Sequence, residues 1–349
     1  MKNNIFLIID GSSMLSTAYY GNLPKQLMFA KTEEEKEKLY SKILQTSDGR
    51  YTNALLTMLR TLYGIYKKVN PTYVAFVFDQ SRNTFRRTEL GADFYKANRK
   101  STPSPLKEQF VAMEKILEDI GCKVLYSETY EADDFAASLV DKFECPDLRT
   151  IVLTKDHDYF QLVSDYTRMW RPVNKDKLIE LQQMYGLYAG ETGYDSLPSN
   201  VFEYTSDIVL AEEGVTPDKI VDLLSIQGDP GDGIPGCKGV ASAAVPLINE
   251  YGSIEGIYEA IEACNGEKKA EKELTTFWKE SLEIKRSPLN ALKEYKEDVL
   301  LSHKLASMKR DIELTEELAD FELNIDKDAL VKVLDDYEMV SLKKDFGLI

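Results

Sequence analysis

The chain has 349 residues, with 59 acidic residues against 43 Lys and Arg, so its formal net charge is −16 and its pI is about 4.8. Hydrophobic residues make up 43% of the sequence, which excludes a disordered chain and suffices for one large domain or two. Its apolar runs are far shorter than the roughly 18 residues that cross a bilayer, and its four scattered cysteines match neither a zinc site nor a disulfide framework. The sequence therefore predicts a soluble cytoplasmic protein, and its acidity by itself argues against a nucleic-acid partner.

The first half of the chain alternates between apolar runs and helical patterns. Three apolar runs have the continuous character of strands buried on both faces of a parallel sheet, at residues 5–9, 73–78 and 150–154. Patterns with helical spacing lie between them, over residues 53–68 and 105–120. This order predicts an α/β fold with a Rossmann-like, mostly parallel sheet, in which ligands bind beyond the carboxyl ends of the strands.

From about residue 206 the strand signal disappears, and helical patterns follow over residues 206–225, 253–264, 274–307 and 327–337. We therefore expect an α/β domain over residues 1–205 and a helical domain over residues 206–349. Two stretches have the composition of insertions. They are residues 25–47, which contain a solvated acidic helix at 33–38, and residues 184–204, which are expected to loop over the surface.

The segment from Tyr130 to Leu139 carries three carboxylates in the first turn of a predicted helix: Glu131, Asp133 and Asp134. The helix dipole favours anions at this end, so simple N-capping is one explanation. Capping needs one carboxylate rather than three, and the segment taken alone therefore fits a cap and a metal site about equally well.

Other carboxylates are expected at the same edge of the sheet, which shifts the balance toward a metal site. They are Asp10 and Asp79 after the first two strands, Asp156 and Asp158 after the third, and Asp229 and Asp232 in a Gly-rich loop of the helical half. Like charges at such short range repel one another strongly unless a cation binds between them. Oxygen ligands without His or Cys favour Mg²⁺ or Mn²⁺, and two such ions are the usual apparatus of phosphodiester hydrolysis.

A basic segment follows Asp79. Residues 82–107 contain seven Lys or Arg and two acidic residues, a local charge of +5, with Phe85, Phe94 and Tyr95 interleaved. Such a run is usually a solvated face, but cations interleaved with stacking residues are also what a single-strand nucleic-acid channel requires. Its position directly after a candidate metal ligand favours the second interpretation.

The loop that starts at Gly228 reads GDPGDGIPGCKG. Its glycines permit a tight turn whose backbone N–H groups can hold phosphate without sequence preference. A plain connector between two helices would need fewer glycines, so we favour contact with the backbone of a duplex.

Together these segments resemble the 5′ nuclease (flap endonuclease) superfamily, in particular the bacterial and phage 5′–3′ exonucleases related to the N-terminal domain of DNA polymerase I. The matching segments follow family order across most of the chain: LIIDGSS at 7–13, FVFD at 76–79, FYKANR at 94–99, EADD at 131–134, TKDHD at 154–158 with QLV at 161–163, and GDPGDGIPG at 228–236. Each motif is weak alone, but the ordered set is specific. Because no polymerase sequence follows, we expect a stand-alone nuclease.

The resemblance implies a PIN-like sheet domain, a helical arch over about residues 80–107 and a helix-three-turn-helix motif that grips duplex DNA over about residues 218–250. It implies that the nine carboxylates hold two divalent ions, Mg²⁺ or Mn²⁺, and it suggests K⁺ at the helix-three-turn-helix. Tyr95 corresponds to an arch-base residue that stacks on a nucleobase, and Lys96 and Arg99 to catalytic cations that contact the scissile phosphate. Further substrate contacts are expected from Arg82, Arg86, Arg87, Gly236, Lys238 and Gly239.

Four departures from the family pattern bear on activity. Ser16, Thr17 and Ala18 stand where relatives carry a basic residue, so one phosphate contact is missing. Ala241 replaces a third hairpin Gly and Ala243 lies near a usual Lys, which weakens the case for duplex or K⁺ binding there. The arch segment is slightly longer than in relatives, and residues 25–47 are added.

Three functional hypotheses remain. The first is a monomeric, metal-dependent, structure-selective 5′–3′ exonuclease and flap endonuclease that cuts DNA flaps, nicks or RNA primers in replication or repair and leaves 5′ phosphates. The second is a non-catalytic DNA-binding relative, motivated by Thr17 and Ala241, although unused clustered charges would destabilise the fold needlessly. The third is a PIN-like RNase, which the Gly-rich loop disfavours because that loop suits a DNA duplex. Under the first hypothesis the acidity reflects the metal ligands, and DNA contacts a narrow basic track.

Overall fold

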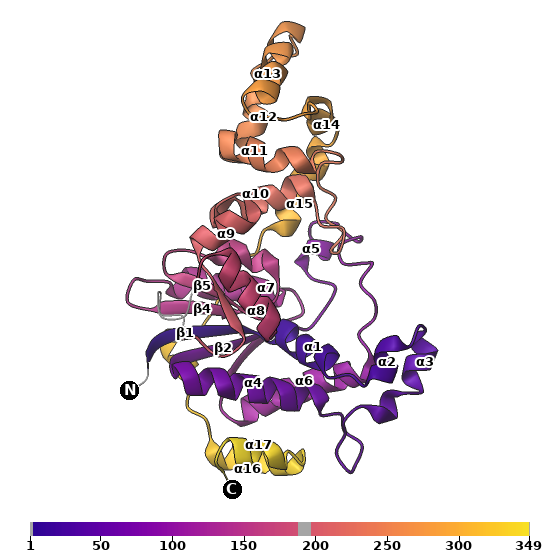
Figure 1. Cartoon of the computed structure of the whole chain (residues 1–349), viewed down its shortest axis with the longest axis vertical. Helices are drawn as coiled ribbons and strands as arrows, with labels where there is room; N and C mark the ends of the chain where they lie inside the picture. The colour runs from indigo at the N-terminus through magenta and orange to yellow at the C-terminus, as the bar shows by residue number, and fades with distance from the viewer. Residues whose placement is uncertain (1–2, 188–196, 349) are drawn as a thin grey trace.

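The computed structural model describes residues 3–187 and 197–348. A six-stranded sheet lies at the centre with helices on both faces, and a mainly helical half extends from one end of it (Figure 1). Within the described residues, none of the helices combines the length and the apolar character that spanning a membrane requires.

The sheet has the strand order β3-β2-β1-β4-β5-β6. Its strands are β1 (Asn3–Asp10), β2 (Pro71–Asp79), β3 (Lys123–Ser127), β4 (Arg149–Leu153), β5 (Thr167–Pro172) and β6 (Val201–Tyr204). Strands β1 to β5 are parallel, and β6 pairs antiparallel with β5. The predicted α/β fold with a mostly parallel sheet is confirmed, and the three apolar runs correspond to β1, β2 and β4.

Side chains of β1 alternate between two cores. Phe6 and Ile8 lie in the core beneath α7 (Ala132–Phe143) and the helical half, whereas Ile5, Leu7 and Ile9 lie in the core beneath α1 (Gly11–Gly21), α4 (Asn53–Val69) and α6 (Ser104–Asp119). All five side chains are buried. Because helices cover both faces, the strand is apolar at every position from Ile5 to Ile9, and its last residue, Asp10, lies at the edge of the sheet.

The helices follow the predicted order. Those of the sheet domain are α1 (Gly11–Gly21), α4 (Asn53–Val69), α6 (Ser104–Asp119), α7 (Ala132–Phe143) and α8 (Lys175–Met184). Those of the helical half are α9 (Ser206–Glu213), η4 (Pro217–Lys219), α10 (Ile220–Gln227), α11 (Ala241–Tyr251), α12 (Ile254–Glu262), α13 (Lys268–Glu280), α14 (Leu289–Glu294) and α15 (Lys296–Ala306). Helices α10 and α11, joined by the Gly-rich loop 228–240, occupy the region expected for the helix-three-turn-helix.

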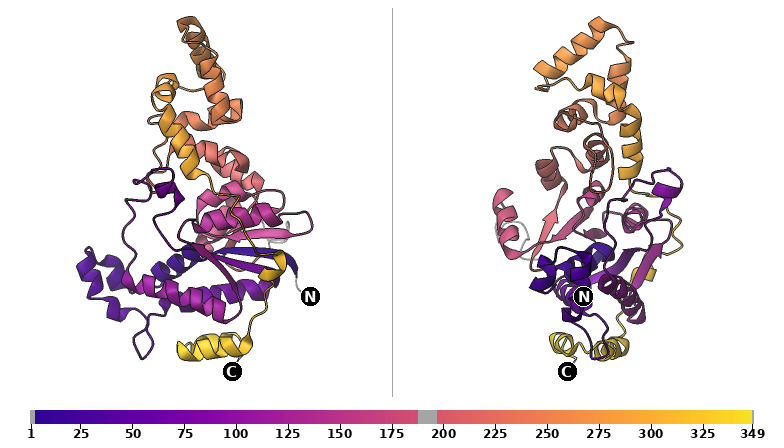
Figure 2. Two further views of the ribbon diagram at one scale, coloured as in Figure 1. Left: turned by 180° about the vertical axis from the view of Figure 1, so that it is seen from behind. Right: turned by 90° about the vertical axis from the view of Figure 1, so that its right-hand side faces the viewer.

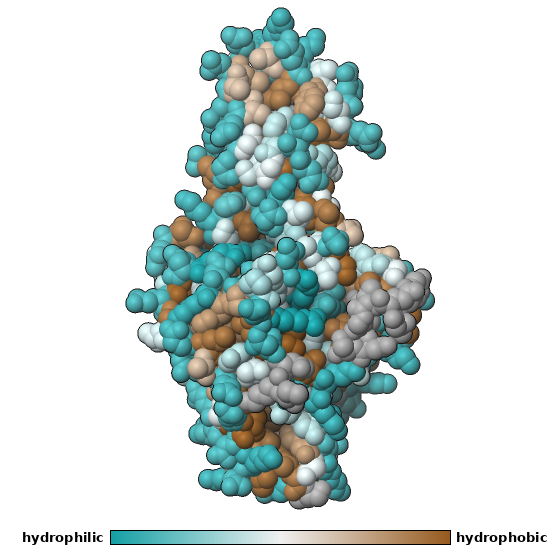
Figure 3. Space-filling view, turned by 90° about the vertical axis from the view of Figure 1, so that its left-hand side faces the viewer, coloured by the Kyte–Doolittle hydropathy of each residue, from teal (hydrophilic) through white to brown (hydrophobic). Residues whose placement is uncertain are grey.

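The end of the chain returns to the sheet, which departs from the expected helical domain over residues 206–349. After η5 (Leu318–Phe321), the backbone N of Leu323 donates to the carbonyl of Thr72, in β2, at 2.9 Å. Helices α16 (Lys327–Asp336) and α17 (Val340–Asp345) then bury Leu334 and Leu342 in the core beneath α4. These helices form the end of the molecule opposite the helical half, where apolar residues reach the surface (Figure 3). Periodicity predicted α16, at residues 327–337, but neither α17 nor the surface on which the two helices pack.

The first insertion forms the short elements α2 (Lys25–Phe29), α3 (Glu33–Glu37) and η1 (Tyr40–Lys42). Helix α3 is exposed as expected, and a capping box between Thr32 and Glu35 starts it.

The second insertion differs from the expected surface loop. Residues 188–196 lie outside the described residues, but Val201, Phe202 and Tyr204 are buried in β6, which completes the sheet.

The expected arch, residues 80–107, contains α5 (Phe85–Thr88), a series of turns and the start of α6. The segment approaches the helical half at α5 and then runs along the side of the molecule toward α2 (Figure 2). Several of its residues, among them Arg82, Lys96 and Lys107, line the cleft described below.

Candidate active site

Three strand ends bring aspartates to one edge of the sheet. Asp10 ends β1 and accepts a 2.7 Å hydrogen bond from Oγ1 of Thr154. Asp79 ends β2 and accepts a 2.9 Å bond from the backbone N of Ala132, the first residue of α7. Both line a cleft of about 650 Å³ together with Asp156, which follows β4. The parallel sheet thus places these three carboxylates side by side, as the strand pattern predicted.

The first turn of α7 adds Glu131 and Asp133 to this group. Glu131 is the N-cap of the helix, and one of its oxygens accepts a 2.8 Å bond from Oγ1 of Thr84. Oδ1 of Asp133 is buried and has no hydrogen-bond partner among the described residues. Leaving such an oxygen unpaired costs about 1–3 kcal/mol or more, so Oδ1 lacks a partner that a bound ligand would supply, whereas Oδ2 lies 4.0 Å from the guanidinium of Arg86.

A second carboxylate group joins the helical half to the sheet. Asp158, Asp229 and Asp232 each offer one oxygen, and these three oxygens lie within 4.8 Å of one another. Asp158 belongs to η2 (His157–Leu162), which follows β4, whereas the other two belong to the Gly-rich loop. Paired backbone hydrogen bonds of 3.0 and 2.8 Å between Asp229 and Ile234 close that loop. The loop therefore delivers carboxylates from a distant part of the sequence, as expected.

Lys96 lies between the two carboxylate groups. Its Nζ forms an ion pair with Glu131 and lies 3.7 Å from Oδ2 of Asp232. Arg99 donates from Nε to Oδ1 of the same aspartate at 2.9 Å. The backbone of Lys96 has a φ of 53°, in the left-handed region, and its N donates to the carbonyl of Asp232 at 2.7 Å. The base of the arch is thereby fixed on the Gly-rich loop.

Burial and mutual repulsion change the ionisation of these groups. Burial, reinforced by the neighbouring aspartates, raises the pKa of Asp10 and that of Asp158 to about 7. Although burial acts on Glu131 in the same direction, the ammonium of Lys96 holds the pKa of Glu131 below its ordinary value. The cluster therefore resists carrying its full negative charge without cations.

This donor set fits divalent cations. It offers carboxylate oxygens in two adjacent groups, one oxygen without a partner and carboxyl groups whose full ionisation is unfavourable. Hard ions such as Mg²⁺ and Mn²⁺ take oxygen ligands of this kind. The sheet-edge group comprises Asp10, Asp79, Glu131, Asp133 and Asp156, and the loop group comprises Asp158, Asp229 and Asp232.

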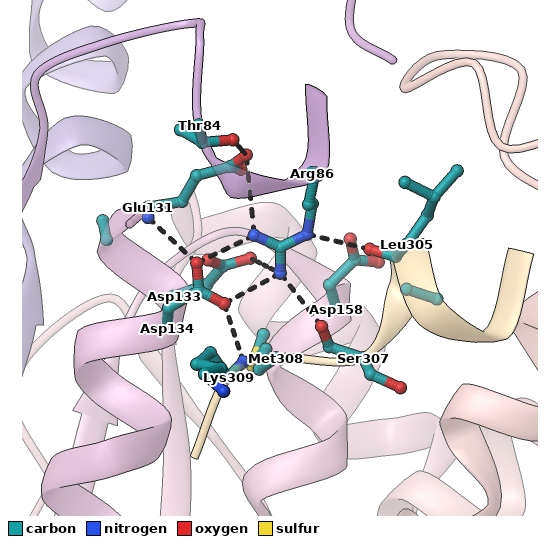
Figure 4. Close-up of polar contacts among 12 residues, drawn as sticks. Thr84, Arg86, Glu131, Asp133, Asp134, Asp158, Leu305, Ser307, Met308 and Lys309 are labelled. Carbon is teal, nitrogen blue, oxygen red and sulfur yellow. Dashed lines mark hydrogen bonds and ion pairs between the residues drawn. The ribbon is translucent and has the colours of Figure 1, made fainter. Parts of the chain in front are cut away.

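Asp134 and Arg86 depart from their expected roles as metal ligand and substrate contact. The guanidinium of Arg86 donates to both carboxylate oxygens of Asp134 at 2.8 Å (Figure 4). The backbone N groups of Glu131 and Lys309 donate to the same two oxygens at 2.9 and 2.7 Å. Each oxygen of Asp134 already accepts two hydrogen bonds, and both side chains are buried, so neither faces the cleft.

Other residues of the arch also differ from expectation. Tyr95 is 3% exposed and its hydroxyl lies 3.4 Å from Glu131, so its ring is not presented for stacking on a nucleobase. Arg87 donates to two carbonyls of its own segment. Arg82 is exposed and lines the cleft, and Phe94 is an exposed aromatic side chain of the segment. Short-range sequence spacing does not distinguish buried from exposed residues in a segment without regular secondary structure.

The predicted duplex contacts lie in the loop 228–240, with one correction. Gly236 is buried and its backbone N donates to Oγ of Ser302 at 2.9 Å, so this N–H is not free for phosphate. Lys238 and Gly239 are exposed, and the latter has a φ of 79°. Of the three duplex contacts expected here, only Lys238 and Gly239 are therefore exposed.

Hydroxyl groups that orient the carboxylates are functional residues that sequence reasoning missed. Thr154 donates to Asp10, and Oγ of Ser12 accepts a 2.9 Å bond from the backbone N of Asp79. A local signal exists, because Ser12 and Thr154 each lie two residues from a carboxylate of the cluster. The hydroxyls link adjacent strand ends and so set the spacing of the carboxylates.

Comparison with known proteins identifies the family. Residues 5–188 match the family model for the 5′–3′ exonuclease N-terminal resolvase-like domain, and residues 215–329 match that for the 5′–3′ exonuclease C-terminal SAM fold. The chain belongs to the 5′–3′ exonuclease family. It is 30% identical to a 5′–3′ exonuclease of Aquifex aeolicus over 98% of this chain and 95% of that protein. The protein is therefore a nuclease, which confirms the resemblance seen in its motifs.

More distant similarities extend this picture. The chain is 28% identical to DNA polymerase I of Bacillus caldotenax over 99% of its own length, but it spans only 32% of the polymerase. Among solved structures, the T5 5′-exonuclease with bound zinc has a TM-score of 0.54 at 17% identity, covering 96% of this chain and 98% of that one. At this identity the structural likeness supports the fold alone.

Proposed function

We propose that this member of the 5′–3′ exonuclease family uses two divalent ions, Mg²⁺ or Mn²⁺, to hydrolyse phosphodiester bonds near the 5′ ends of DNA, leaving 5′ phosphates. The observation that carries the proposal is the pair of adjacent carboxylate groups at one sheet edge, with Lys96 between them. When bound, the two ions supply an activated water and stabilise the leaving oxygen.

The two carboxylate groups divide the proposed metal ligands. The sheet-edge group of Asp10, Asp79, Glu131, Asp133 and Asp156 would hold one ion, and the loop group of Asp158, Asp229 and Asp232 the other. The hydrogen bonds from Thr154 and to Ser12 fix the carboxylates of the first group before any ion binds. The helical half takes part in catalysis because it supplies ligands to the second group.

Lys96 and Arg99 are the proposed catalytic cations. Both line the cleft and both contact Asp232, so their charges sit beside the carboxylates where a phosphate would enter. Cations held in place before substrate arrives stabilise developing negative charge without a cost of reorganisation. These side chains would thus orient the scissile phosphate and stabilise its charge.

The positions of the exposed cations favour a DNA substrate in which a single strand continues into a duplex. Arg82, Lys100 and Lys107 line the cleft, which suits a strand backbone, and Lys238 projects from the Gly-rich loop of the helical half. We propose that this loop holds the adjacent duplex, with K⁺ at the same place, and that a monomer acts on flaps, nicks and RNA primers.

A 5′-labelled flap substrate tests the proposal. Purified protein with Mg²⁺ is expected to release the flap, and Asp133→Asn or Asp156→Asn should slow cleavage by more than the roughly 10–100-fold that outer partners of a metal site contribute. Asp119→Asn is a matched control, because this exposed aspartate pairs with Lys115 on α6 away from the cluster. It should retain the activity of the unmodified protein.

Three outcomes would contradict the proposal. Absence of cleavage in any divalent ion, with flap binding retained, would favour the non-catalytic relative. Preference for an all-RNA flap over DNA would favour the PIN-like RNase. Cleavage that persists in both aspartate variants would place the ions elsewhere.

A further inference from the structure

Arg86 is a buried cation directly behind the carboxylate cluster. Its side chain is 1% exposed, and its guanidinium donates four hydrogen bonds of 2.8 to 3.0 Å, two of them to Asp134 (Figure 4). The other two go to the carbonyls of Leu305 and Ser307 at the end of α15. Glu131 lies 3.5 Å from the same group. The guanidinium therefore uses nearly all of its N–H donors inside the protein.

These bonds join three segments that are far apart in the sequence. Arg86 itself belongs to α5 in the arch segment, Asp134 belongs to the first turn of α7, and the two carbonyls belong to the helical half. The carbonyls at a helix end lack intrahelical partners, so a buried cation satisfies them and complements the helix dipole. One side chain therefore holds the arch, the sheet domain and the helical half together at the active site.

Asp134 connects the hydrogen bonds of Arg86 to the proposed metal ligands. The carboxylate of Asp134 accepts from the backbone N of Glu131 and so closes the first turn of α7 from behind. Glu131 and Asp133 precede it in the same turn, and their carboxylates lie 3.5 and 4.0 Å from the Arg86 guanidinium, while Glu131 also lines the cleft. A shift of Asp134 would turn the helix end and move both ligands.

We propose that Arg86 is a positioning residue of the nuclease: through Asp134 and the end of α15 it aims Glu131 and Asp133 at the ion site, and it makes no contact with DNA. This inference rests on the proposed function, because it concerns how the ligands of the proposed ion site are held in position. A lysine cannot replace the arginine, since one ammonium cannot span a carboxylate and two carbonyls in a fixed plane.

The test removes the guanidinium of Arg86 and its hydrogen bonds without changing the net charge near the ions. Arg86→Met/Asp134→Asn removes one positive and one negative charge, and the new amide oxygen can still accept from the backbone N of Glu131. Arg86→Lys keeps the charge pair and serves as the second variant if the first does not fold. Arg310→Met is the matched control, because Arg310 also joins the segment after α15 to α7, through Asp141, but lies at the surface.

The measurements are Mn²⁺ affinity without DNA, thermal unfolding in EDTA, and affinity for a flap substrate in EDTA. We expect the double variant to bind Mn²⁺ roughly 10–100-fold more weakly than the unmodified protein, with DNA affinity unchanged within twofold. Arg86→Lys should recover part of the loss, and Arg310→Met should bind Mn²⁺ normally. A purely structural role would lower the unfolding temperature without changing the affinity of the folded protein.

Unchanged Mn²⁺ affinity in folded Arg86 variants would overturn the inference. A loss of DNA affinity with normal Mn²⁺ binding would also overturn it, in favour of a direct DNA contact. If the unmodified protein binds no Mn²⁺, the proposed function fails and this inference fails with it. The two failures are thus distinguishable.

Discussion

Two aspartates of the cluster, Asp10 and Asp158, have raised pKa values. Burial and neighbouring carboxylates raise the pKa of Asp10 and that of Asp158 to about 7, from an ordinary value near 4. Because the raised values mean that ionisation is unfavourable in the folded protein, these two groups reduce the stability of the metal-free protein as pH rises from about 4 to about 7, and the loss levels off above that. Bound cations would reverse this effect.

Metal affinity should therefore depend on pH. A carboxyl group must lose its proton before it binds an ion, so Mn²⁺ affinity is expected to rise by up to about tenfold per pH unit for each group between pH 5.5 and 7, and to level off above pH 7.5. Titration of Mn²⁺ at several pH values measures this dependence. Asp158→Asn should flatten the curve, and an affinity independent of pH would show that neither group holds its proton near neutral pH.

Close backbone contact couples the arch segment to the Gly-rich loop. Gly233 has a φ of 78°, and a Cβ at this position would lie 2.9 Å from the carbonyl O of Phe94. Phe94 lies two residues before Lys96 in the arch segment. Only glycine tolerates both the left-handed backbone and this approach. The small residue therefore lets Lys96 reach between the two carboxylate groups.

Substitution of this glycine should lower activity without removing any catalytic side chain. Gly233→Ala is expected to push the arch base away from the loop and slow flap cleavage by about 10–100-fold, because displacements near 1 Å at reacting groups have effects of this size. Gly266→Ala is the control: its φ is 75°, but a Cβ there meets open space. Equal activity of the two variants would show that the contact is not required.

The whole molecule is strongly acidic, yet five exposed cations lie along the cleft and the Gly-rich loop. Arg82, Arg99, Lys100 and Lys107 line the cleft, and Lys238 lies on the Gly-rich loop. With a net charge of −16, the remaining surface repels a polyanion. Binding of DNA should thus depend on about five phosphate contacts rather than on the average charge of the protein.

Affinity for a flap substrate should fall steeply with salt. Five contacts predict a decrease of roughly 100- to 500-fold between 50 and 200 mM monovalent salt, measured with Ca²⁺ in place of Mg²⁺. Lys238→Ala should reduce the slope of log affinity against log salt by nearly 1, whereas Lys269→Ala, on α13, should leave it unchanged. A shallow slope in the unmodified protein would mean that the cationic route is not the DNA site.

Much of the fold and of the cluster could be predicted from the sequence, because the signals are local. Continuous apolar runs identified β1, β2 and β4, and the edge where parallel strands end gathers the residues that follow them, among them Asp10, Asp79 and Asp156. The Gly-rich loop was recognisable because its backbone needs residues that tolerate positive φ, as at Gly228 and Gly233. Strand β6 and the return of α16 and α17 to the sheet were not predictable in this way, since their short apolar patterns do not specify a packing partner.

The sequence by itself determined the α/β class, the carboxylate-rich strand ends and the family, all of which depend on residue type and order along the chain. Only the tertiary structure decided which charged residues face the cleft. Arg86 and Arg82 look alike in the basic segment, but one is buried against Asp134 and the other lines the cleft. The reason is physical: burial of a charge depends on partners such as Leu305 and Ser307, which lie more than 200 residues away and meet Arg86 only in the folded chain.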